Sequence, residues 1–280
     1  MLSVIVGTKL GYYSWSGFEY QPSGRVVVTP TDGHVFWGAI SRAVRTPTQV
    51  ERDLSFTLPS APPLPPTIPT ILTGDRSARS EELLAFELGY RFFSMERLSM
   101  EIAVFWNEYE SRSSFVVTAV PPPSLNISFA SRDELTVRGV EFEINAVPAP
   151  WWHLKLAYSY QHIDEDLDST SVSFGKVAQD NPKHQFNVQS FFDLPMDFEF
   201  DVAVYYTDGV PGTTPTAQPK NVEQYVRLDL RLGWKPVEWA EIALIGQNLT
   251  DRRHYESTDF TLGQSTQVPR SGVAKVTLNF

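Results

Sequence analysis

The sequence YVRLDLRLGW, residues 225–234, alternates strictly between two kinds of side chain. Its even-numbered positions are apolar, whereas most of its odd-numbered positions are charged. Successive side chains of a β-strand point to opposite faces of a sheet, so this segment predicts a strand with one apolar face and one charged face. Such a strand suits a transmembrane β-barrel, in which the apolar face contacts lipid and the polar face lines a wet lumen.

The same alternation recurs along the chain and predicts about 12 strands in all. The other segments that show it are 2–12, 18–29, 35–44, 84–92, 98–106, 136–147, 152–160, 184–192, 198–206, 241–249 and 272–280. An even number of strands joined by hairpins is typical of bacterial outer-membrane barrels. The predicted fold class is therefore all-β, an antiparallel up-and-down transmembrane β-barrel that occupies residues 1–280 as one domain.

Short and long connections alternate between the predicted strands. The short ones, rich in turn-forming residues, are 31–34, 94–97, 148–150, 194–197 and 235–238. The long ones are 45–80, 111–125, 163–183, 207–222 and 252–268. Short turns are expected on the periplasmic side and long loops outside the cell. We expect the prolines of the first long loop to make it stiff, with polyproline II character rather than a helix, and a flexible loop is the alternative.

Aromatic residues collect at both ends of the predicted strands. Those near the short turns include Phe92, Phe93, Trp151, Trp152, Trp234 and Trp239, and those toward the long loops include Tyr12, Tyr13, Trp15, Trp106, Tyr109, Tyr160 and Tyr206. Because such rings favour the headgroup level of a bilayer, they predict two aromatic girdles. The alternative is the core of a soluble β-sandwich.

Composition excludes several classes of function. A formal net charge of −10 over 280 residues excludes nucleic acid as a partner, because phosphate binding needs clustered Lys and Arg. The absence of cysteine excludes disulfides and thiolate sites. Residues 1–10 lack the basic and apolar regions of a signal peptide and instead predict a strand. We therefore expect the chain to be a fragment of a longer exported protein.

A search for catalytic and metal-binding patterns predicts no enzyme, no metal site and no cofactor. His153, His162, His184 and His254 lack the spacing of metal ligands, and no Ser, His and acid trio stands out. A 12-stranded outer-membrane phospholipase remains the alternative enzyme. The acidic run 164–168 offers oxygen ligands for a hard cation, but it lacks the glycine turn of a calcium loop, so we predict a solvated loop tip.

Five stretches together resemble the C-terminal part of TonB-dependent outer-membrane receptors. They are FEYQPSGR at 18–25, FWGAISRAVRTP at 36–47, GVEFE at 139–143, GQNLTDRRHY at 246–255 and VAKVTLNF at 273–280. In that family the C-terminal aromatic residue, here Phe280, is similar to the signature that the barrel assembly machinery reads. The resemblance implies a multi-pass barrel of the Gram-negative outer membrane, in contact with lipid and lipopolysaccharide.

The resemblance also implies what is missing. A complete receptor carries a signal peptide, a TonB box and a globular plug inside a barrel of about 22 strands. None of the N-terminal parts is present, so the TonB complex is expected to act only through that missing part. The chain would then be part of a 22-stranded barrel and would not transport anything alone.

The function implied by the resemblance is uptake of a scarce small-molecule ligand, most simply a metal chelate such as a ferric siderophore. Candidate ligand contacts are loop and rim residues: Tyr13, Trp15, Arg42, Arg45, Arg52, Arg76, Arg252 and Tyr255. A passive pore of about 12 strands and a soluble carbohydrate-binding sandwich are the alternatives.

The charged face of the strands has two candidate roles. Its residues either contact a plug and ligand or form cross-strand ion pairs in a hydrated lumen, and we favour the ion pairs. They are Glu87, Arg91, Glu101, Glu141, Glu143, Lys155, Glu199, Asp201, Arg227, Asp229 and Arg231.

Overall fold

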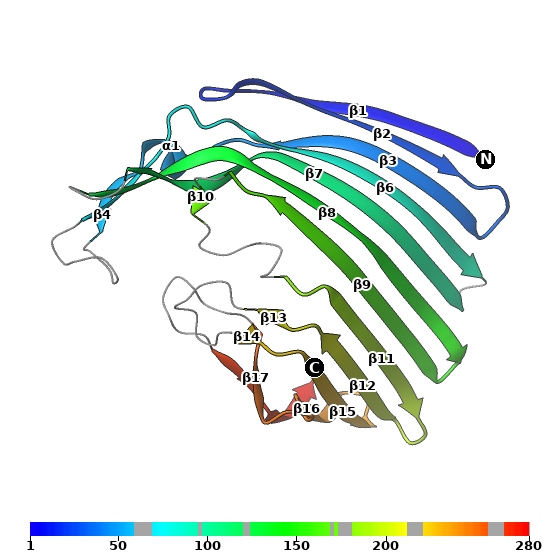
Figure 1. Cartoon of the computed structure of the whole chain (residues 1–280). Helices are drawn as coiled ribbons and strands as arrows, with labels where there is room; N and C mark the ends of the chain where they lie inside the picture. The colour runs from blue at the N-terminus through cyan, green and yellow to red at the C-terminus, as the bar shows by residue number, and fades with distance from the viewer. Residues whose placement is uncertain are drawn as a thin grey trace.

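The computed structural model of the chain is one curved antiparallel sheet with small additions at its outer end (Figure 1). It describes residues 1–58, 69–94, 97–119, 124–168, 171–172, 181–211, 221–256 and 266–279. Within these ranges the one helix is α1 (Gln49–Asp53). None of the described helical structure is long and apolar enough to cross a membrane.

The sheet follows an up-and-down path in which each strand pairs with the next one along the path. Its twelve strands are, in order, β1 (Leu2–Tyr13), β2 (Gly17–Val28), β3 (His34–Arg45), β6 (Glu81–Ser94), β7 (Leu98–Ala119), β8 (Leu125–Ala149), β9 (Trp152–Asp166), β11 (His184–Leu194), β12 (Phe198–Thr207), β15 (Tyr225–Val237), β16 (Ala240–Gln247) and β19 (Ser271–Leu278). The prediction of about 12 strands in this fold class is confirmed. In the described residues β1 and β19 are the two edges and do not pair with each other.

The two faces of the sheet are those that the alternation predicts. Even-numbered side chains form an apolar face that stays open, with Leu88 64%, Leu244 58% and Val276 63% exposed. Only eight apolar residues of the described chain are buried. A soluble sandwich would bury its apolar faces between two sheets, so this arrangement disagrees with a soluble domain and suits a face that contacts lipid.

Rings from neighbouring strands stack at the short-turn end of the sheet. Trp152 contacts Phe192 with ring centroids 5.8 Å apart, and Phe192 contacts Phe200 at 6.3 Å. Phe198 and Trp234 stack at 5.7 Å and 11°. These contacts connect the four strands β9, β11, β12 and β15 at one level of the sheet, where the sequence predicts an aromatic girdle.

The prediction of a long loop at 111–125 is wrong for most of these residues, because the strands on both sides continue through them. β7 reaches Ala119 and β8 begins at Leu125, which gives strands of 22 and 25 residues. A register shift between Tyr109 and Arg112, with Ser111 at φ 55°, marks a bulge. A bulge bends and twists a strand without ending it. The hairpin therefore projects beyond the rest of the sheet.

Short strands extend this projecting hairpin on both edges. β5 (Thr70–Thr73) pairs in parallel with β8, and β4 (Ser55–Leu58) pairs with β5. β10 (Ser171–Val172) pairs with β7. In the main sheet β6 pairs with β7 and β9 pairs with β8, but here the pairing is reversed: β5, which precedes β6, pairs with β8, and β10, which follows β9, pairs with β7. A two-stranded ribbon twists strongly, and a strong twist of the β7–β8 hairpin brings each of its edges to the opposite side.

The projecting part has a small apolar core of its own. Val116 and Ala130 are each 3% exposed and Ile127 is 7% exposed. The rings of Phe115 and Phe129 lie 4.4 Å apart across the hairpin. We call the sheet β4-β5-β8-β7-β10, with α1 beside it, the outer extension. Its buried side chains make it a packed element rather than a loose loop.

Two other predictions about loops change with the structure. The prolines 62–66 of the first long loop lie outside the described residues, but the same loop forms α1, β4 and β5, which the sequence did not predict. The acidic run is not a solvated loop tip: Asp164 and Glu165 lie in β9. Glu165 is paired with Arg112 at 3.4 Å and its side chain is only 5% exposed, so that prediction was wrong.

Two further hairpins lie in the long loops near the C-terminus. They are β13 (Val210–Pro211) with β14 (Asn221–Val222), and β17 (Arg253–Tyr255) with β18 (Gln267–Pro269).

Candidate functional site: the lumen face and the outer rim

The odd-numbered side chains form a face, here called the lumen face, that encloses a hollow of about 700 Å³. Four carboxylates line it, together with polar and aromatic groups. The lining includes Trp37, Glu87, Glu101, Phe105, Asn107, Glu141, Glu143, Ser159, Gln185 and Asn187. Glu101 and Glu143 are directly opposite each other on β7 and β8, where like charges repel. This hollow therefore favours a positively charged occupant.

Large rings lie flat on glycines in the floor of the hollow. A Cβ atom on Gly89 would fall 2.3 Å from the Trp37 ring, and one on Gly139 would fall 2.6 Å from the Phe105 ring and 2.2 Å from the Tyr160 carbonyl oxygen. Any side chain at these two glycines would displace the rings, so the floor depends on glycine. The Arg25 guanidinium lies over the Trp37 ring, 5.2 Å from its centroid.

Elsewhere on the lumen face the predicted cross-strand ion pairs are present. Arg231 reaches Glu199 at 2.9 Å, Asp201 at 3.0 Å and also Glu241, which joins three neighbouring strands. Arg91 binds Glu101 at 2.7 Å. Within the described residues Glu87 and Glu141 have no ion pair. The charged face is thus partly self-neutralised and keeps carboxylates free in the hollow.

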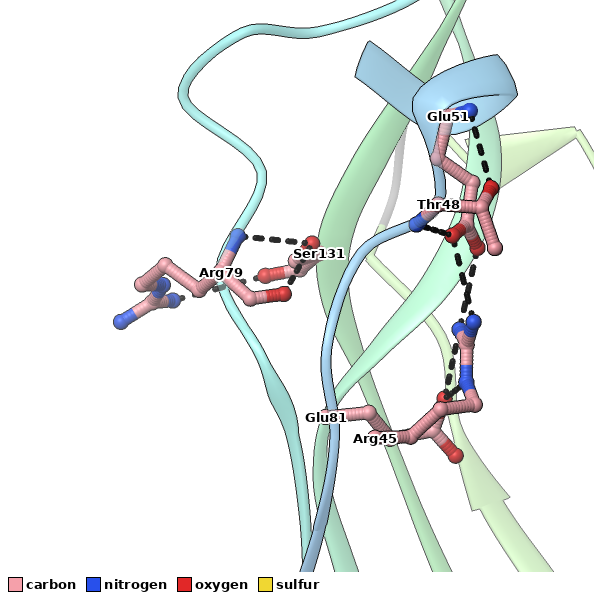
Figure 2. Close-up of polar contacts among 6 residues, drawn as sticks. All are labelled: Arg45, Thr48, Glu51, Arg79, Glu81 and Ser131. Carbon is pink, nitrogen blue, oxygen red and sulfur yellow. Dashed lines mark hydrogen bonds and ion pairs between the residues drawn. The ribbon is translucent and has the colours of Figure 1, made fainter. Parts of the chain in front are cut away.

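At the outer rim α1 is fixed by a capping box and an ion-pair network (Figure 2). The Glu51 amide donates to the Thr48 hydroxyl at 3.2 Å, and the Thr48 amide donates to the Glu51 carboxylate at 2.7 Å. Arg45 donates to Glu51 at 3.0 Å and to Glu81 at 3.0 Å. These contacts tie the helix to the ends of β3 and β6.

The contacts of Glu51 change its acidity. Burial alone would raise its pKa, but hydrogen bonds from Arg45, from the Thr48 amide and from Ser113 outweigh burial and lower the pKa to about 2. Glu51 is therefore a permanent anion at neutral pH, and Arg45 is its counterion.

A second contact at the rim joins two residues predicted as ligand contacts. The Arg52 guanidinium lies 5.4 Å from the centroid of the Trp15 ring, and Trp15 is 48% exposed. The buried Arg52 Nε and the neighbouring Ser16 hydroxyl have no hydrogen-bond partner in the described chain. No carboxylate pairs with Arg52 there either, whereas Arg76 is paired with Asp53 at 2.9 Å. Arg52 is thus a cation still able to bind an anion.

The structure brings together four of the eight candidate residues. Arg52 belongs to α1, and Trp15, Arg45 and Arg76 contact its residues Arg52, Glu51 and Asp53 respectively. Arg42 lies on the even-numbered, apolar face, where it binds Glu82 at 2.8 Å and covers the Tyr20 ring at 4.4 Å.

The other three candidates are not part of the contacts described for α1. Tyr13 ends β1, and its ring lies over Gly11. Arg252 and Tyr255 belong to the separate loop that holds β17. Within the described residues no group of His, Asp or Glu side chains is arranged to hold a metal ion.

Sequence reasoning missed Glu51 and Glu81, the residues that position Arg45. The pattern Thr48-x-x-Glu51 is a capping-box signature and could have located α1. It also missed Asn248, which is fully buried at φ 54° and donates to the Val268 carbonyl at 3.0 Å. Asn248 lies in the GQNLTDRRHY stretch, and its left-handed backbone is a conformation that asparagine tolerates.

An antiparallel sheet with an exposed apolar face and a charged, hollow opposite face is the wall of a transmembrane β-barrel. Residues 2–249 match the family model "TonB dependent receptor-like, beta-barrel". The chain belongs to this family of receptors and transporters of the Gram-negative outer membrane, which is not a class of enzymes.

Solved structures with the same fold include three siderophore-type receptors. The ferric enterobactin receptor PfeA of Pseudomonas aeruginosa, as its G324V mutant, matches with TM-score 0.78 and 14% identity over 100% of this chain and 43% of its own. The siderophore receptor PirA of Acinetobacter baumannii matches with TM-score 0.75 and 14% identity over 100% of this chain and 43% of its own. The ferric-catecholate import receptor Fiu of E. coli K12 matches with TM-score 0.74 and 15% identity over 94% of this chain and 35% of its own. The chain thus spans less than half the length of these proteins.

Proposed function

We propose that this chain forms the ligand-facing part of a receptor barrel for TonB-dependent uptake of a scarce ligand, a ferric siderophore. The observation that carries the proposal is the hollow, carboxylate-lined lumen face within a sheet of this family. The siderophore receptors with the same fold support the ligand class. In this proposal the TonB complex is the partner that supplies the energy for uptake.

The lumen face is proposed to hold a plug domain with a basic surface. Glu87, Glu141 and Glu143 have no ion pair in the described chain, whereas Glu101, opposite Glu143, is already paired with Arg91. Guanidinium or ammonium groups of a plug would neutralise the three carboxylates that lack a cation. In the described residues the edge strands β1 and β19 do not pair with each other, which favours a barrel of about 22 strands over a closed 12-stranded pore.

The remaining partners follow from the surfaces of the sheet. The apolar face is proposed to contact lipid and lipopolysaccharide of the outer membrane. The barrel assembly machinery is proposed to read Phe280, which lies outside the described residues.

For the ligand itself we propose the cluster around α1, with Arg52 and Trp15 as the main contacts. A guanidinium on an indole ring offers charge and a flat apolar surface to an anionic aromatic chelate. Tyr13, Arg42, Arg45, Arg76, Arg252 and Tyr255 remain proposed contacts of lower rank, because the nearby acids already pair with Arg42, Arg45 and Arg76.

Ligand binding can be measured by quenching of tryptophan fluorescence when ferric enterobactin is added to the purified chain in detergent. Arg52→Gln is expected to weaken binding about tenfold, since a hydrogen bond to a charged group contributes about that much. Arg253→Gln, which removes the same charge in another outer loop, is the control. Saturable binding that Arg52→Gln leaves unchanged would exclude the α1 cluster, and no binding by the wild-type chain would argue against a siderophore.

A further inference from the structure

The charge on the lumen face reverses toward the short-turn end of β7, β8 and β9. Along β8 the lumen side chains run from Glu141 and Glu143 to Asn145. Asn145 is opposite Ser99 on one side and Lys155 on the other. Each step of two residues advances about 7 Å along a strand, so the acidic hollow gives way to basic groups within one or two steps.

These basic groups line a second, smaller hollow of about 340 Å³. Arg97, His153 and Lys155 contribute its nitrogen-bearing side chains, and Ser99 contributes a hydroxyl. The Val147 amide donates to the Arg97 carbonyl at 2.7 Å, which fixes the backbone of Arg97 beside β8. His153 and Lys155 are two residues apart on β9 and therefore share the lumen face. We call this hollow the basic rim pocket.

The two cations of the basic rim pocket, Arg97 and Lys155, have no counterion in the described chain. Neither of them forms an ion pair there, His153 forms none either, and no carboxylate residue lines the pocket. The one ring contact of Lys155 is with Phe191, at 5.9 Å from the centroid. Arg91 and Arg231 on the same face are each bound by carboxylates. Clustered cations without counterions repel each other, and a bound anion removes that cost.

We propose that the basic rim pocket binds an oxyanion, that is, a carboxylate or phosphate group. The Arg97 guanidinium suits the two oxygens of such a group, while the Lys155 ammonium and the Ser99 hydroxyl supply further donors. The pocket is large enough for one oxyanion with its stem. The same chemistry is offered by an acidic polypeptide segment and by free phosphate, and the lumen face then presents two zones of opposite charge to whatever fills it.

The experiment titrates the folded chain in detergent with two probes, inorganic phosphate and an acetylated, amidated peptide of glutamates. Binding is followed by NMR at the backbone amides of Ser99 and Lys155. Saturable shifts of both amides are expected with at least one probe. Lys155→Gln is expected to weaken that binding about tenfold. Lys275→Gln removes the same charge on the same face of the distant strand β19 and is expected to change nothing.

Each outcome decides something. Tighter binding of the peptide assigns the pocket to a polypeptide partner, and tighter binding of phosphate assigns it to a small anion. Absence of shifts with both probes, or equal weakening by Lys155→Gln and Lys275→Gln, would overturn the proposal. Ser99→Ala serves as a milder second variant if the strand signal in circular dichroism shows that Lys155→Gln misfolds. Since no siderophore is used, the result does not depend on ligand binding by the cluster around α1 or on transport.

Discussion

Glu51 joins the helix cap and the ion-pair network of the outer rim in one side chain. Replacing it with Gln keeps an acceptor for the capping box and removes the charge, whereas Ala removes both. We expect Glu51→Gln to destabilise the α1 region by about 1–2 kcal/mol and Glu51→Ala by about 1 kcal/mol more. Hydrogen exchange of the Gly74 and Asp75 amides, which bind carbonyls of Leu54 and Glu51, measures this. Equal exchange in all three proteins would contradict it.

The lowered pKa of Glu51 also predicts a dependence on pH. Because the folded-state pKa of about 2 lies below the ordinary value of 4.5, the stabilisation is complete above about pH 4.5 and is lost as the pH falls toward 2. Exchange of the Gly74 amide, corrected for its intrinsic pH dependence, should therefore accelerate over that range in the wild-type chain. Glu51→Gln is the control and should not show this acceleration. The same pH profile in the wild-type chain and in Glu51→Gln would show that another acid causes the acceleration.

Single residues of the candidate site could be predicted from the sequence only in part. Exposed Arg and Trp in long loops are visible as residue types, and four of them do meet at α1. Their pairing could not be predicted, because Trp15 and Arg52 are brought together by packing between loops. Nor does the sequence show that Glu82 neutralises Arg42, since that pair joins β3 and β6 across 39 intervening residues.

Within the outer extension, Asp133 fixes the loop that follows β9. Its carboxylate is buried and accepts hydrogen bonds from the Asp168 amide at 3.0 Å and the Ser171 hydroxyl at 2.7 Å. Asp133→Ala leaves both donors without this acceptor, so the hydrogen bond from the Ser171 amide to the Asp168 carbonyl, 2.8 Å long, should weaken, and exchange of that amide should accelerate tenfold or more. Asp133→Asn keeps one acceptor oxygen and should give an intermediate rate. Unchanged exchange in Asp133→Ala would show that Asp133 is not needed to hold Ser171 beside Asp168.

The strands of the main sheet were predictable and those of the outer extension were not, for one physical reason. Lipid on one side and water on the other impose alternation over ten or more residues, and that signal is strong. β5 has four residues and β10 has two, which are too few to show a period. Their pairing depends on the twist of the long β7–β8 hairpin, and twist has no signature in residue order.

The whole molecule should not conduct ions as a closed pore does, because its twelve strands form an open sheet in the residues that the structure describes. The edge strands β1 and β19 would leave backbone groups in the bilayer without partners, which lipid cannot satisfy. We expect the purified chain to give no steady ohmic channel in planar bilayers, while a closed porin measured beside it does. Stable channels of uniform size from this chain would instead support closure at twelve strands and the passive-pore function.

Arg231 constrains how this barrel wall can change over evolutionary time. Loss of any one of Glu199, Asp201 or Glu241 leaves the guanidinium two acceptors, so each acid can be replaced while the other two remain. Loss of the arginine would leave Asp201 and Glu241 without a cation on neighbouring strands, while Glu199 would keep its ion pair with Lys235. Among relatives, the arginine at position 231 should therefore be invariant, while the three acids vary one at a time. A relative that has replaced the arginine should already have lost those acids.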